Sequence, residues 1–193
     1  HYAVTLFGRG LARFAGTNGN ADPVLAKKNL LRSIRIEPTF AEAHRVYALL
    51  QEAIGDPKAA KAHRDQALSA HPRYFPVIQQ NAQIALQSGK KKVALALHQR
   101  LISLRPWDRA IRYTLADLLW HDGQGALAAE HFKHLSQGAP KNLRYRRMLA
   151  VVHGEDGNQE ALLKELEAIH QQVPHDIQTL LDLSATHVAL GHA

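Results

Sequence analysis

Apolar residues recur along the chain at the spacing of amphipathic helices, in segments separated by short polar turns. The first segment covers residues 2–15, and its apolar stripe consists of Val4, Leu6, Phe7, Leu11 and Phe14. The polar stretch 16–20 predicts a turn, because glycine and asparagine favour turns. A second helix is expected to begin at Pro23, with Asp22 as its N-cap, and to run to Pro38.

The remainder of the chain repeats this pattern as pairs of helices joined by short turns. The expected helices are 41–54 and 58–70, 75–88 and 91–104, 109–122 and 125–137, 143–156 and 159–172, followed by a single helix 177–190. A chain with this pattern and few aromatic residues is predicted to be all-α.

Three kinds of residue recur with a period of 34. The prolines are Pro38, Pro72, Pro106, Pro140 and Pro174; the small residues are Ala48, Ala82, Ala116, Ala150 and Ser184; the turn glycines are Gly55, Gly89, Gly123, Gly157 and Gly191. A fixed period in this range is the mark of a repeat array. The prolines stop each second helix, and the glycines are expected to end each first helix in the left-handed conformation.

Small residues also recur in the second helices, at Ala60, Ala94 and Ala128. Together with the small residue of each first helix, they let the two helices of a pair approach closely. One pair cannot bury both of its faces, so the array is expected to be stable only as a stack.

These positions resemble the tetratricopeptide repeat family, whose repeat is an antiparallel helix pair of about 34 residues. The match is complete at the small residue of the first helix and partial elsewhere, since Leu162 stands at a position where the family has a small residue. The resemblance implies a right-handed superhelical solenoid and a binding scaffold. It implies one array over 1–193, with units 1–40, 41–74, 75–108, 109–142 and 143–176 and a terminal helix 177–190.

The resemblance also implies a concave groove lined by the first helices, in which a peptide or a protein segment would bind. Carried onto this chain, the family's groove positions give Arg45, Gln79, Gln83, Tyr113, Asp117, Trp120, Arg144 and Arg147. Glu42, Leu49, Gln87, His121 and Val151 occupy further groove positions. Trp120 is the sharpest candidate, because aromatic residues are common binding hot spots; the alternative is that it packs beside a neighbouring helix.

Charge is distributed unevenly along the chain, whose net charge is +7. Residues 1–147 hold 23 of the 24 Lys and Arg and 10 of the 17 Asp and Glu, which gives +13. Residues 148–193 hold Lys164 and seven acidic residues, which gives −6. This asymmetry suggests an acidic partner for the basic part, or end-to-end pairing of two arrays.

Several chemistries find no support in the sequence. The absence of cysteine excludes disulfides and thiolate sites, and no apolar run is long enough to span a membrane. No catalytic motif is recognisable, so neither an enzyme nor a cofactor is expected. His131 and His134 lie three residues apart on one helix, but no carboxylate is placed to complete a metal site. The Lys and Asn clamp of chaperone-binding members of the family is missing.

Two other functions stay open beside peptide binding. The first is a structural spacer or self-association element of a larger, bacterial-looking protein, of which this chain would be a piece. The segment 177–190 supports it, because its apolar residues lie on more than one face and need a cover. The second, weaker alternative is nucleic-acid binding through the basic residues of 1–147. The sequence argues against it, because its aromatic residues are not interleaved with the basic ones as a platform for single strands requires.

Overall fold

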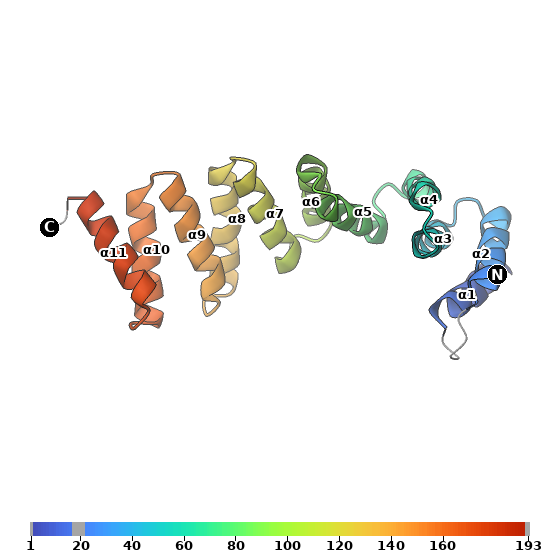
Figure 1. Ribbon diagram of the computed structural model, residues 1–193, viewed down its shortest axis with the longest axis horizontal. Helices are drawn as coiled ribbons and strands as arrows, with labels where there is room; N and C mark the ends of the chain where they lie inside the picture. Colours follow the sequence, from blue (N-terminus) through green and yellow to red (C-terminus); the bar gives the residue numbers. More distant parts are fainter. Residues whose placement is uncertain (1, 17–21, 192–193) are drawn as a thin grey trace. The chain divides into compact units, whose positions relative to one another are not determined.

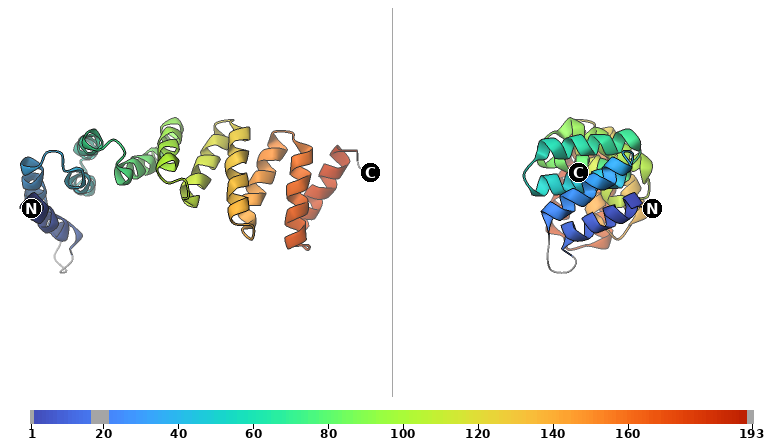
Figure 2. Two further views of the ribbon diagram at one scale, coloured as in Figure 1. Left: turned by 180° about the vertical axis from the view of Figure 1, so that it is seen from behind. Right: turned by 90° about the vertical axis from the view of Figure 1, so that its right-hand side faces the viewer.

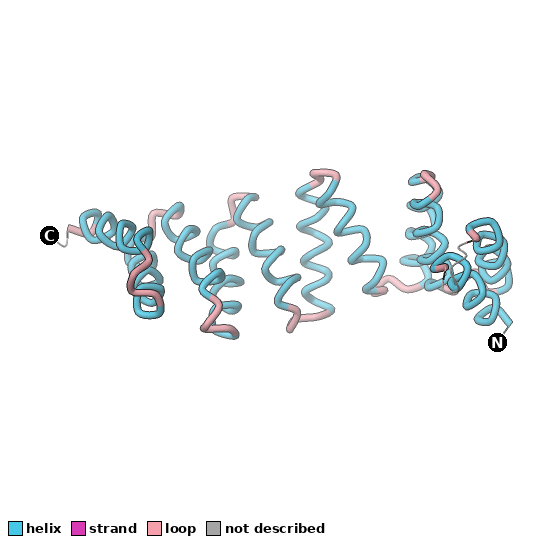
Figure 3. The backbone as a smooth tube through the Cα atoms, turned by 60° about the horizontal axis from the view of Figure 1, so that its bottom comes forward, coloured by secondary structure: helices cyan, strands magenta, loops and turns pink. Residues whose placement is uncertain are grey.

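The computed structural model describes residues 2–16 and 22–191, and within these ranges the chain consists of helices joined by short loops, without strands (Figure 3). The helices are α1 (Tyr2–Ala15), α2 (Pro23–Ile36), α3 (Ala41–Ala53), α4 (Pro57–Ala70), α5 (Phe75–Gln87), α6 (Lys91–Leu104), α7 (Arg109–His121), α8 (Gly125–Gly138), α9 (Leu143–Glu155), α10 (Gln159–Gln172) and α11 (Ile177–Ala189). Every helix expected from the sequence is present, with ends displaced by no more than one or two residues. The all-α fold class is confirmed.

The ends of the helices follow from local side-chain and backbone chemistry. The Asp22 side chain accepts a hydrogen bond of 2.9 Å from the Leu25 amide, and Pro23 occupies the first helical position, as expected. The five turn glycines of the 34-residue period have φ between +66° and +83°, which confirms their left-handed conformation. Most of the predicted turn 16–20 lies outside the described residues.

The chain divides into two compact units, residues 1–80 and 81–193. In the first unit, α1 packs on α2, α2 on α3, and α3 on α4. One core cluster consists of Ala26, Leu30, Val46, Tyr47 and Leu50, with Phe7, Phe14 and Ile34 packed against it. A smaller cluster joins Ala41, Ala67 and Val77 with Leu68 and Tyr74. The organisation of both units as one array stays a prediction.

In the second unit, consecutive helices from α6 to α11 pack against one another. Helices α8 to α11 lie side by side in chain order in Figure 1 and in the left view of Figure 2. The core of this unit is centred on the fully buried Phe132 of α8, which is surrounded by Leu115, Leu119, Leu135 and Leu149. Helices α7 to α10 therefore each pack against both the preceding and the following helix.

The small residues of the repeat are buried in the helix pairs of the described chain, with one exception. Ala48, Ala82, Ala116 and Ala150 are at most 5% exposed, and Ala60, Ala94 and Ala128 are fully buried. Ser184, the last member of the series, is exposed instead. No second helix follows α11 among the described residues, so no paired helix covers Ser184 in the way that the second helices cover the first helices elsewhere.

A histidine pair, buried His44 and half-buried His63, links α3 and α4 in the first unit. The Nδ1 atoms of His44 and His63 are 2.9 Å apart, and Nε2 of His44 lies 3.0 Å from the carbonyl oxygen of Pro38. Because the carbonyl must accept, His44 donates from Nε2 and its Nδ1 accepts from His63. Burial lowers the pKa of His63 below its ordinary value of 6.5, and the neighbouring His44 lowers it further.

The turn glycines allow a paired test of backbone strain. We expect Gly89→Ala to destabilise the protein by about 1 kcal/mol, because Gly89 has a φ of +66° although an added Cβ would meet no atom within 4 Å. Gly8→Ala, in equally open space in the middle of α1, should instead stabilise it by roughly 0.5 kcal/mol. Urea denaturation of the two variants measures the difference; equal effects would contradict the strain argument.

The histidine pair predicts a loss of stability in acid. Because the pKa of folded His63 is lowered, the unfolded chain binds more protons than the folded chain once the pH falls to about 6.5. The contribution of His63 to the free energy of unfolding is therefore complete above pH 6.5 and declines as the pH falls through this value. Urea denaturation at about pH 7.5 and about pH 5.5 should show a smaller loss for His63→Gln than for the wild type. The other histidines are common to both proteins, and equal losses would contradict the prediction.

Candidate functional site on α7, α9 and α11

Tyr113 of α7 and Arg144 of α9, both predicted groove residues, contact each other. The Arg144 guanidinium lies 4.3 Å from the centre of the Tyr113 ring, and its Nε donates a hydrogen bond of 3.2 Å to the tyrosine hydroxyl. The other side of Tyr113 packs edge-on against the buried Phe132 at 5.6 Å. Tyr113 is therefore held in one orientation, with an exposed arginine over its ring.

Trp120, the penultimate residue of α7, is half-buried against the core of the second unit. Its Nε1 donates a hydrogen bond of 2.5 Å to Oε2 of Glu155 at the end of α9, and its ring stacks on His121 at 4.6 Å. His121 in turn lies 3.8 Å from the predicted Asp117. The alternative reading of Trp120 thus holds in part, because the indole packs beside a neighbouring helix while part of it stays accessible.

Arg147 of α9 forms an ion pair with Asp176, the residue that precedes α11. Its Nη2 atom is 3.0 Å from Oδ2 of Asp176, and the hydroxyl of Thr179 donates to the same oxygen at 2.6 Å. The arginine side chain is 55% exposed. Because the pair is open to water on the arginine side, it contributes little to stability, but it fixes where the guanidinium lies.

These three contacts share one sequence separation. Their partners are 31, 35 and 29 residues apart, which is about one repeat. The first two contacts join a residue of one repeat to a residue of the next, and the third joins the first helix of unit 143–176 to the last residue of that unit, directly before α11. The side chains that do not repeat in the sequence hold consecutive repeats together, and the sequence reasoning missed these partners because it assigned each groove residue to an external ligand alone.

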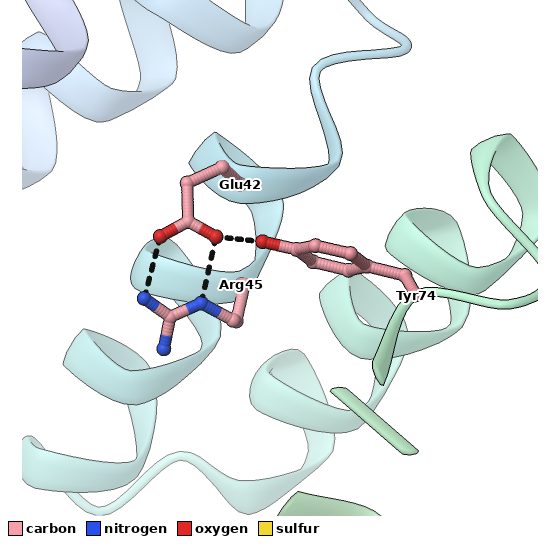
Figure 4. A network of polar contacts seen from close by, with 3 residues as sticks. All are labelled: Glu42, Arg45 and Tyr74. Carbon is pink, nitrogen blue, oxygen red and sulfur yellow. Dashed lines mark hydrogen bonds and ion pairs between the residues drawn. The ribbon is translucent and has the colours of Figure 1, made fainter. Parts of the chain in front are cut away.

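The first unit contains a similar contact around the predicted Arg45. Glu42 receives two hydrogen bonds from Arg45, of 2.6 and 2.8 Å, and a third from the hydroxyl of Tyr74, which directly precedes α5 (Figure 4). The hydrogen bond to Glu42 raises the pKa of Arg45. The remaining predicted residues, Gln79 and Gln83, are exposed on α5, and the first belongs to unit 1 and the second to unit 2.

A cavity of about 610 Å³ opens between α9, α10 and α11, and Arg147 stands at its edge. Val151 of α9 and Gln178, Ala185 and Ala189 of α11 line it. The α11 residues were missed as site candidates because the groove positions were carried onto the complete repeats and not onto the terminal helix. Applied to 177–190, the same spacing would have found them.

Two charged groups on this surface have no oppositely charged partner. Among the described residues, neither Arg144 of α9 nor Asp182 of α11 forms an ion pair, although Asp182 accepts a hydrogen bond of 2.8 Å from Gln178. Both are available to charges on a ligand. The surface therefore offers an arginine over an aromatic ring at one place and a carboxylate beside an apolar cavity at another.

The described helices provide neither a metal cluster nor a membrane span. No cluster of three or more His, Asp or Glu suited to a metal occurs within the described ranges. His131 instead lies with its Nδ1 3.3 Å from the guanidinium of Arg112. No described helix has the length and apolar character required for a membrane span.

The comparisons with known proteins point to one family. The model of the tetratricopeptide repeat family matches residues 85–152. This segment includes α6 to α8, the end of α5 and most of α9. No curated protein matches the chain in sequence.

Solved structures share the fold at low sequence identity. YrrB, described as a TPR protein with an unusual peptide-binding site, is 15% identical with a TM-score of 0.63, and the match covers 84% of each chain. A tetratricopeptide repeat protein from Parabacteroides merdae is 18% identical with a TM-score of 0.63, over 98% of this chain and 74% of that one. MamA from Desulfovibrio magneticus is 16% identical with a TM-score of 0.61, over 91% and 97%. Residues 85–152 therefore match the tetratricopeptide repeat family, and the chain shares the fold of solved tetratricopeptide-repeat proteins.

Proposed function

We propose that this protein is a non-catalytic scaffold that binds a segment of another protein along α7 and α9 of its second unit. Tetratricopeptide-repeat proteins generally act as interaction scaffolds. The observation that supports the location is the arrangement of Tyr113, Trp120 and Arg144, which are accessible aromatic and arginine side chains on consecutive first helices. Trp, Tyr and Arg are the residues that most often dominate binding energy.

The contacts within the chain favour binding by these side chains. Tyr113 is held by Phe132 and Arg144, and the Trp120 indole by Glu155 and His121. Side chains that are already ordered lose little rotamer entropy when a ligand arrives, and this loss is one of the main costs of association. The same contacts stabilise the array and prepare its surface for a partner.

Acidic residues in the bound segment would match Arg144. Its guanidinium is exposed and forms no ion pair among the described residues, so a carboxylate can approach it without breaking an existing pair. The structural neighbour YrrB is itself described as having an unusual peptide-binding site, which makes a peptide ligand a reasonable proposal here. We further propose that residues 1–193 form a single array, as the uninterrupted period of 34 suggests.

A second candidate function is self-association through α11. Ile177, Leu181 and Val188 of this helix are 73%, 60% and 74% exposed. Apolar side chains exposed together on one element commonly mark an interface. The acidic charge of 148–193 and the basic charge of 1–147 would favour contact between opposite ends of two copies.

The binding proposal predicts that substituting either of two aromatic residues lowers the affinity for peptides. Peptides are selected from a random phage library on the wild-type protein, and their affinities are measured by fluorescence anisotropy. Trp120→Ala and Tyr113→Ala should each weaken binding by about tenfold or more, because each removes a hot-spot ring. Trp107→Ala is the matched control, since this residue is 76% exposed and lies in the loop between α6 and α7.

Circular dichroism melts of the variants show whether the array still folds. Failure to select any peptide, or unchanged affinity of a folded Trp120→Ala variant, would reject the binding surface.

The self-association candidate predicts a change in mass with concentration. Sedimentation equilibrium should show dimers or larger species of the wild type, and Leu181→Asp should shift them to monomer, because a buried charge without a partner destabilises an interface. Leu181 is 60% exposed, so the substitution leaves the fold intact. A wild-type protein that stays monomeric at high concentration would reject this candidate.

A further inference from the structure

The cavity between α9, α10 and α11 has an apolar interior. Leu162, Leu166 and Ile169 of α10 form one wall, and Val151, Ala185 and Ala189 face it from the first helices. Its volume of about 610 Å³ falls in the range of pockets that bind ligands. Val151, Ala185 and Ala189 are exposed, so the cavity can be entered from the surface.

Small residues create this cavity, although the neighbouring atoms leave room for larger side chains at these positions. A Cβ added to Gly154, at the end of α9, would lie 3.6 Å from Cδ2 of Leu162, which is an ordinary contact. Ala185 and Ala189 lie one turn apart on α11 and present only methyl groups to the opening. Larger side chains would fit at these positions, so close packing does not explain why the space is left open.

The edge of the cavity carries more negative than positive charge. Arg147 and Asp176 neutralise each other at 3.0 Å, and this leaves the Asp182 carboxylate without an ion pair among the described residues. The surrounding segment 148–193 has a net charge of −6. A segment that carries a cation beside an apolar group would find a partner for each here, a carboxylate and an apolar space next to it.

We infer that this cavity binds a large apolar side chain of the partner segment and that a Lys or Arg next to it in the segment pairs with Asp182. The inference rests on the proposed function, because Arg147 at the cavity edge follows Arg144 by three residues on α9 and so faces the same side of that helix. One segment crossing α9 would meet Arg144 first and the cavity next. Its sequence would then combine an acidic residue with a basic residue beside an apolar one.

The test uses the peptides selected on the wild-type protein and four variants of α10 and α11. Ala185→Leu fills the cavity from an exposed position, and Asp182→Lys reverses the charge at its edge. Ser184→Leu and Glu160→Lys make the same changes at exposed positions outside the cavity. Ala189→Leu replaces Ala185→Leu if the latter lowers the melting temperature.

We expect Ala185→Leu to weaken peptide binding by about tenfold. Asp182→Lys should weaken the binding of peptides that carry Lys or Arg, and it should strengthen the binding of the same peptides when Glu replaces that Lys or Arg. The two control variants should bind as the wild type does. Equal affinity of the Lys and Glu peptides, or unchanged binding by both cavity-filling variants, would overturn the inference. If Trp120→Ala still weakened those peptides, the proposed function would survive that result.

A second measurement probes the cavity without any peptide. Methyl signals of Val151 and Ala185 are followed by NMR during titration with n-octylammonium and with octanoate. We expect shifts with the cation that Ala185→Leu abolishes, and weak or absent shifts with the anion. Equal response to both probes, or none to either, counts against a cavity selective for cations, whatever the peptide selection shows.

Discussion

The close approach of paired helices is the constraint on which this structure depends. Ala60, Ala94 and Ala128 of the second helices are fully buried, and the alanines Ala48, Ala82 and Ala116 of the first helices are at most 1% exposed. Because these residues lack bulky side chains, the larger residues around them, such as Leu115, Phe132 and Leu149, can interlock across the helix pair. A stack built in this way buries each repeat against its neighbours and depends on no single central core.

The polar contacts between repeats add specificity to this apolar stack. Tyr113 with Arg144, Trp120 with Glu155, and Arg147 with Asp176 join residues about one repeat apart. Such partly exposed pairs contribute modestly to stability. Their larger effect is to hold aromatic rings and guanidinium groups in defined positions at the surface, and ordered side chains of these types are well suited to binding.

Among the described residues, the last helix differs from the preceding ones because no following helix packs against it. Helix α11 packs on α10 and leaves a cavity against α9, while Ile177, Leu181 and Val188 are exposed on its surface. Where a second helix covers the first, as α8 covers α7, the corresponding small residue Ala116 is fully buried; Ser184 of α11 is exposed. The acidic segment 148–193 therefore combines accessible apolar surface with the Asp182 carboxylate, which forms no ion pair among the described residues.

The sequence by itself determined the repeat, the eleven helices of the described chain and their ends, because proline, alanine and the turn glycines act locally and recur with a period of 34. It also identified Tyr113, Trp120, Arg144 and Arg147 as surface candidates. The tertiary structure decided what these side chains contact, since Glu155 and Asp176 are distant in sequence and reach them only when repeats stack. The cavity beside α11 likewise arises from three helices together, and its size depends on packing that no local pattern specifies.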